Sequence, residues 1–147
     1  MKDGLPFRIL VVEDDEDDRI FIDEAFLEIG YAAEVKKFKD GKMLLDYLEQ
    51  IPPALYPTLI VLDNNLPGWD ATDMLTILKG NTAYHKICLV VYSTVMTDSL
   101  AEKLQAAGAD ACMEKGNTFK GVIRLAKELQ TMSEANKNQQ NAMPDRN

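Results

Sequence analysis

The chain has 147 residues, a length that fits one domain with a single hydrophobic core and a short tail. Hydrophobic residues make up 46% and charged residues 27%, as in soluble globular proteins, and the formal net charge of -8 disfavours direct binding to nucleic acids or anionic membranes. No apolar run is long enough to cross a bilayer and the first residues lack a signal-peptide core, so we expect a cytoplasmic protein. The two cysteines, Cys88 and Cys112, form no metal-binding motif and are expected to be core residues.

Apolar runs and helical patterns alternate along the chain. The run 7–12 ends in a block of acids, 13–18, which begins a helix to about residue 29. A weaker strand over 33–38 leads into a second helix over 43–51, which two prolines end. The run 58–62 is the clearest buried strand, and a loop and a helix over 70–79 follow it. A strand over 87–92, a helix over 99–107, a short strand over 111–113 and a helix over 118–132 complete the pattern.

This alternation predicts right-handed strand–helix–strand units and a parallel sheet covered on both faces. Five such units fit a flavodoxin-like, doubly wound (βα)5 fold of the α/β class with strand order 2-1-3-4-5. We therefore expect one domain over residues 7–132. Residues 133–147 are polar and amide-rich, and we expect a disordered tail or a short extension of the last helix.

Polar side chains stand where four of the five expected strands end. Glu13 and Asp14 follow the first strand, Asp63 the third, Ser93 the fourth and Lys115 the fifth. The carboxyl ends of parallel strands meet at one edge of the sheet, where such folds bind ligands. Carboxylates there suit magnesium, which prefers oxygen ligands, and an ionised Asp63 can attack phosphorus to give an acyl phosphate. The Lys115 ammonium and the Ser93 hydroxyl are suited to bind phosphoryl oxygens.

Other polar residues fit simpler interpretations. The acids 15–18 are typical of a helix N-terminus, and Asp70 is expected to cap the third helix. His85, the only histidine, lies in a polar loop and is expected to be solvated, so a phosphoryl group would have to come from another molecule.

Five motifs occur in the order and spacing of a known family. They are ILVVEDD at 9–15, LIVLDNNLPG at 59–68, Ser93, AAGAD at 106–110, and Lys115. Over about 7–132, the chain resembles the receiver domain of two-component response regulators, of the single-domain type. The resemblance implies that Asp63 is the phospho-acceptor, that Glu13 and Asp14 are the acidic pair, and that Ser93 and Lys115 bind the phosphoryl group. It also implies that the backbone carbonyl of Asn65 is a magnesium ligand.

The resemblance further implies a signalling switch rather than an enzyme, with only self-phosphorylation and autodephosphorylation chemistry. The phosphoryl donor would be a sensor histidine kinase or a histidine phosphotransfer protein. The output would be contact with a downstream protein or onward transfer in a phosphorelay, and a homodimer is possible.

Four positions depart from the family pattern. The family usually has glycine at the position of Ala71 and a small residue at the position of Thr94. The bulkier Thr94 is expected to narrow access to Asp63. At the position of Cys112 the family commonly has an aromatic residue, whose side chain rotates inward on activation. The small side chain of Cys112 cannot make that rotation. Where this chain has Gly116, the family has a proline joined to the preceding lysine by a cis peptide bond. We expect the conformational freedom of Gly116 to give this loop its shape in place of the cis bond.

Two alternatives remain open. A magnesium-dependent hydrolase with an aspartyl-phosphate intermediate commonly needs an acid two residues after its nucleophile, where this chain has Asn65. A phosphorylation-independent docking module would form no acyl phosphate at all. Steady phosphatase turnover would favour the hydrolase, and the absence of any acyl phosphate would favour the docking module.

Overall fold

The computed structural model describes residues 9–31 and 35–142. Within these ranges, five strands alternate with five α-helices, and one 3-10 turn lies at Pro53–Leu55. The elements are β1 (Ile9–Val12), α1 (Glu16–Glu28), β2 (Val35–Phe38), α2 (Gly41–Gln50), β3 (Leu59–Asp63), α3 (Ala71–Lys79), β4 (Cys88–Ser93), α4 (Asp98–Ala107), β5 (Ala111–Glu114) and α5 (Phe119–Ala142). All neighbouring strands pair in parallel in the order β2-β1-β3-β4-β5, which confirms the predicted flavodoxin-like topology. No helix within these ranges combines the length and the hydropathy needed to span a bilayer.

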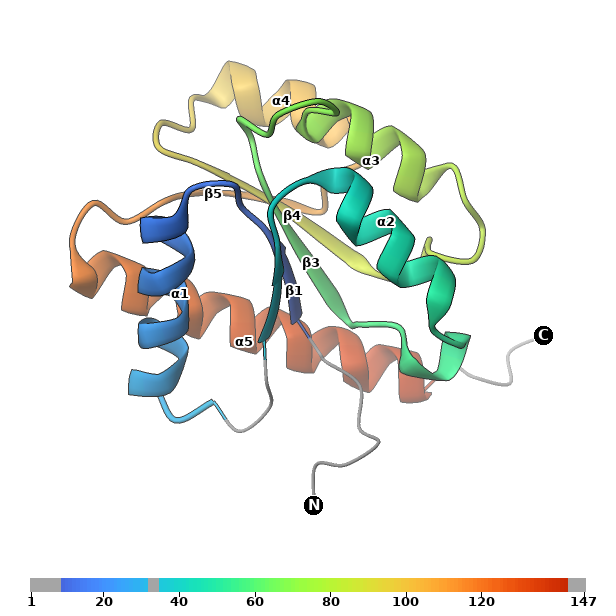
Figure 1. Ribbon diagram of the computed structural model, residues 1–147, viewed down its shortest axis with the longest axis horizontal. Helices are drawn as coiled ribbons and strands as arrows, with labels where there is room; N and C mark the ends of the chain where they lie inside the picture. Colours follow the sequence, from blue (N-terminus) through green and yellow to red (C-terminus); the bar gives the residue numbers. More distant parts are fainter. Residues whose placement is uncertain (1–8, 32–34, 143–147) are drawn as a thin grey trace.

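The sheet is covered by helices on both faces, as Figure 1 shows. Helices α1 and α5 pack on one face, and α2, α3 and α4 pack on the other. Successive residues of the central strands therefore enter different cores: Leu10, Ile60 and Leu89 belong to one core, and Ile9, Leu59 and Val90 to the other. Because both faces are buried, these strands are continuous apolar runs rather than alternating ones.

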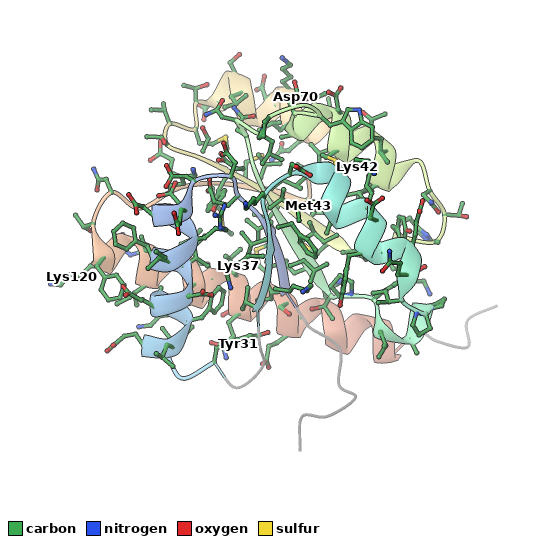
Figure 2. The ribbon with its side chains drawn as sticks, in the orientation of Figure 1. Tyr31, Lys37, Lys42, Met43, Asp70 and Lys120 are labelled. Carbon is green, nitrogen blue, oxygen red and sulfur yellow. The ribbon has the colours of Figure 1, made fainter. Side chains whose placement is uncertain are left out.

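Side chains cap the helices that begin at the carboxyl edge of the sheet. Asp15 accepts a hydrogen bond from the N–H of Asp18 at the start of α1, at 3.0 Å. Asp70 and Asp73 form a reciprocal capping box at the start of α3, which confirms the predicted cap. Figure 2 labels Asp70 where α3 begins. These caps satisfy backbone N–H groups that would otherwise lack partners, so the helices start at fixed positions beside the strand ends.

The last helix is longer than its apolar periodicity predicted. The apolar pattern ends at Met132, and of the two expectations for the polar segment the extension of the helix is the one observed over 133–142, where α5 continues to Ala142 along one face of the sheet (Figure 1). The Ser133 hydroxyl is buried and hydrogen-bonds the Thr58 hydroxyl at 2.5 Å. The Asn136 amide donates to the carbonyls of Thr58 and Lys86, at 2.7 and 3.1 Å. The start of the polar segment after Met132 is therefore attached to the amino edge of the sheet by hydrogen bonds rather than by apolar packing.

Candidate functional site

Three carboxylates meet at the carboxyl edge of the sheet. Glu13 directly follows β1, Asp14 is the next residue, and Asp63 ends β3. Because β1 and β3 are paired in register, one oxygen of each carboxylate lies within 4.8 Å of the others. Glu13 and Asp63 are buried, whereas Asp14 is exposed. The cluster thus combines two carboxylates held in the protein interior with a third that is open to solvent.

The ammonium group of Lys115 lies among these acids. Its Nζ atom is 3.1 Å from Glu13 Oε1, 3.2 Å from Asp63 Oδ2 and 3.0 Å from Oδ2 of Asp18 on α1. Burial acts to lower the pKa of Lys115, but the hydrogen bond to Asp18 and the charges of Glu13 and Asp63 outweigh it and raise the pKa. Lys115 is therefore a permanent cation at the centre of the site.

Glu13 is held on both of its carboxylate oxygens. The Tyr92 hydroxyl donates to Oε1 at 2.6 Å, and the backbone N–H of Asp15 donates to Oε2 at 3.1 Å. Burial, followed by the interaction with Asp63, raises the pKa of Glu13 to about 7, although both donated bonds act in the opposite direction. A buried carboxylate next to another carboxylate is costly to ionise, so the cluster favours the arrival of positive charge.

Ser93 and Asn65 flank the acids. Ser93 ends β4 and is buried, and its carbonyl accepts from the backbone N–H of Lys115 at 2.8 Å, which ties the ends of β4 and β5 together. Asn65 is exposed in the loop after β3, and its N–H donates to Asp63 Oδ1 at 3.2 Å. Thr94 is exposed directly after Ser93. All of the predicted site residues therefore lie at one edge of the sheet.

The loop that carries Lys115 uses glycine for a reason that the sequence did not predict. Within the described ranges no peptide bond is cis, and Gly116 does not have a positive φ. A Cβ atom on Gly116 would lie 2.3 Å from the carbonyl carbon of Gly121, and one on Gly121 would lie 2.9 Å from the Cα of Gly116. The expectation of conformational freedom at Gly116 is thus corrected. The glycine is required because the loop backbone packs directly against the first turn of α5.

Two contacts of the site were missed by the sequence interpretation. Asp18 was assigned only to the helix terminus, yet it also binds Lys115. Tyr92 was assigned only to a buried strand, yet its hydroxyl contacts Glu13. For Tyr92 the sequence did hold a signal, because a buried tyrosine hydroxyl usually needs a hydrogen-bond partner, and this strand ends at the predicted site. For Asp18 no feature separated it from the neighbouring acids.

Comparisons with known proteins agree with this geometry. A family model described as the response regulator receiver domain matches residues 9–127. A probable methanogenesis regulatory protein, FilR2 of Methanothrix harundinacea, is 28% identical over 126 residues, which are 84% of this chain and 81% of that protein.

Two solved structures share the fold. The phosphorylated cyanobacterial phytochrome response regulator RcpA has a TM-score of 0.73 at 26% identity, covering 85% of this chain and 91% of that one. The manganese-bound response regulator Rcp1 has a TM-score of 0.73 at 24% identity, covering 86% and 93%. Since the family match extends over most of the chain and includes the acidic cluster at the sheet edge, this protein belongs to the response regulator receiver domain family.

Proposed function

We propose that the chain is a phospho-accepting signalling switch, in which Asp63 takes up a phosphoryl group with the help of bound magnesium. The observation that carries the proposal is the buried Asp63 carboxylate, which lies beside Glu13 and 3.2 Å from the Lys115 ammonium. The site is at the carboxyl edge of a parallel sheet, the position at which doubly wound folds bind their ligands.

The chemistry of the site fits magnesium. The carboxylates of Glu13, Asp18 and Asp63 contact the Lys115 ammonium, and an oxygen of Asp14 lies within 4.8 Å of those of Glu13 and Asp63, so acids outnumber the lysine in this cluster. Its donor atoms are oxygens, which magnesium prefers. Glu13, Asp14, Asp63 and the backbone carbonyl of Asn65 would hold the ion. Rcp1, a protein of the same fold, has been solved in a manganese-bound form, which supports a divalent cation as the ligand.

The transfer itself needs a nucleophile and groups that accept negative charge. A carboxylate oxygen of Asp63 attacks the phosphorus of a phosphohistidine, a P–O bond forms, and the P–N bond breaks with its electron pair leaving on the imidazole. Lys115 binds a phosphoryl oxygen, and the Ser93 hydroxyl donates to another. Bound magnesium would supply positive charge that offsets the negative charge developing in the transfer.

The only histidine of this sequence is not placed to donate a phosphoryl group to Asp63. His85 is exposed before β4, at the opposite edge of the sheet from Asp63, and its Nδ1 atom lies 2.7 Å from the Thr82 carbonyl. The phosphoryl group would therefore come from a sensor histidine kinase or a histidine phosphotransfer protein in the cytoplasm. The switched state would be read by a downstream protein, by a second copy of this chain, or by a further relay protein.

Intact-mass spectrometry after treatment with acetyl phosphate and magnesium tests the proposal. We expect one added phosphoryl group on the native chain and none on Asp63→Asn. Asp46→Asn is the matched control, because Asp46 is an exposed acid on α2 that pairs with the exposed Lys42 of the same helix. The control should carry the adduct, and omission of magnesium should abolish it.

Binding of beryllofluoride to the native chain is measured in parallel. A native chain that gains no phosphoryl group and binds no beryllofluoride would contradict the proposal and leave a receiver-shaped docking module. An adduct that persists in Asp63→Asn would assign the acceptor to another residue.

A further inference from the structure

Tyr92 connects β4 to the acidic cluster from inside the core. It is paired with Asp63 across the β3–β4 ladder, and its side chain reaches Glu13 at the end of β1. Tyr92 is 1% exposed and Glu13 is 0% exposed, so the bond between the hydroxyl and Oε1 is formed in the protein interior. At 2.6 Å it lies in the short range of hydrogen bonds between a hydroxyl and a carboxylate.

Tyr92 and Lys115 both contact the same oxygen of Glu13, but they are held differently. The ammonium of Lys115 is shared between Glu13, Asp18 and Asp63, and its aliphatic stem is flexible. The ring of Tyr92 is packed in the core between the sheet and the helices α1 and α5. If a phosphoryl group on Asp63 drew Lys115 away from Glu13, the Tyr92 hydroxyl would still donate to this oxygen.

We propose that Tyr92 is a positioning residue for magnesium binding, because its hydroxyl holds the Glu13 carboxylate in the orientation in which it faces the ion. This inference rests on the proposed function, since it assumes that the acidic cluster binds magnesium. Groups that orient metal-binding carboxylates by hydrogen bonding typically contribute tenfold or more to metal affinity. The loss of the Tyr92 hydroxyl should therefore weaken magnesium binding by roughly tenfold.

The ring of Tyr92 makes a second contact with the site. The Lys115 Nζ atom lies 4.9 Å from the centroid of this ring, within the range of a cation–π interaction. Tyr92→Phe keeps the ring and removes only the bond to Glu13, whereas Tyr92→Leu removes both contacts. Tyr92→Phe thus isolates the hydroxyl, and Tyr92→Leu should weaken beryllofluoride binding more than Tyr92→Phe does.

Titration calorimetry with magnesium chloride tests the role of the hydroxyl. We expect Tyr92→Phe to raise the dissociation constant roughly tenfold. Tyr84→Phe is the matched control, because Tyr84 is a buried tyrosine before β4, at the opposite edge of the sheet, and it packs against Tyr56. The control should bind magnesium like the native chain. Circular dichroism and thermal unfolding of each variant verify that the fold is kept.

A double-mutant cycle with Glu13 separates positioning from a general structural effect. In a Glu13→Gln background the carboxylate to be oriented is absent, so adding Tyr92→Phe should change magnesium affinity less than about twofold. A tenfold loss in that background would overturn the inference, as would equal affinities of the native chain and Tyr92→Phe. A native chain that binds no magnesium would overturn the proposed function as well, so the two failures are distinguishable.

Discussion

Magnesium binding to the acidic cluster should displace a proton from Glu13. Burial, with the neighbouring Asp63, raises the pKa of this carboxyl group from 4.5 to about 7 in the metal-free protein. Below pH 7 the ion must therefore compete with a bound proton, and above pH 7 the carboxylate is already ionised. Magnesium affinity should increase as the pH rises through 7.

The magnitude follows from the pKa. With a value of about 7, Glu13 is protonated in a ratio of about ten to one at pH 6 and about one to ten at pH 8. The apparent dissociation constant should then fall about tenfold between pH 6 and pH 8, which corresponds to about 1.4 kcal/mol. Binding should release about 0.9 proton per ion at pH 6 and about 0.1 at pH 8.

Titration calorimetry at both pH values, each in two buffers with different ionisation enthalpies, measures the affinity and the proton count together. Glu13→Gln is the control, and its weaker affinity should vary little over this range because the titrating group is absent. Equal dissociation constants of the native chain at pH 6 and pH 8, with no proton released at pH 6, would refute the reasoning.

Three further predictions concern stability. Glu13 binds its proton more tightly in the folded chain than in the unfolded chain, so it contributes stability that is present below about pH 4.5 and lost by about pH 7. In urea titrations without metal, the free energy of unfolding of the native chain should fall by about 3 kcal/mol relative to that of Glu13→Gln as the pH rises over this range. A difference between the two chains that does not change with pH would contradict this. Gly121→Ala places a Cβ atom 2.9 Å from the Cα of Gly116. It should lower the free energy of unfolding by about 2 kcal/mol and slow phosphorylation by acetyl phosphate. An unchanged urea midpoint would argue against the close approach of the two backbones. Ser133→Ala should cost about 1 kcal/mol through the lost bond to Thr58, whereas Ala at the exposed Glu134 should cost nothing measurable, and equal effects of the two would count against the contact.

The strands of the sheet, and the meeting of the site residues at one edge of it, were predictable from short-range sequence patterns. A strand buried on both faces must be apolar throughout, so runs such as 58–62 were enough to indicate the central strands. The parallel topology then brought Glu13, Asp63 and Lys115 to one edge, because residues at the carboxyl ends of neighbouring parallel strands are neighbours in space.

Other features depend on geometry that no local pattern contains. Whether Asp18 or a neighbouring acid reaches Lys115 depends on the rotation of α1 about its axis relative to the loop after β5. The role of Gly116 depends on a backbone contact with Gly121, and Ser133 and Asn136 of α5 form hydrogen bonds with Thr58, which lies far earlier in the chain. Hydrophobic periodicity reports burial of apolar surface only, so it could not decide between a disordered tail and an extension of the last helix.

The course of α5 matters for anyone who wishes to join this domain to another protein. The family pattern ends at residue 127, inside α5, whereas buried residues such as Leu129 and Ser133 lie beyond it. A chimera joined at residue 127 would cut the helix between the loop of Lys115 and the amino edge of the sheet. It would also lose the hydrogen bonds from the Asn136 amide to the carbonyls of Thr58 and Lys86. A junction after residue 142 keeps the helix whole, and its 24 residues, about 36 Å long, would then set the direction in which an attached module leaves the domain.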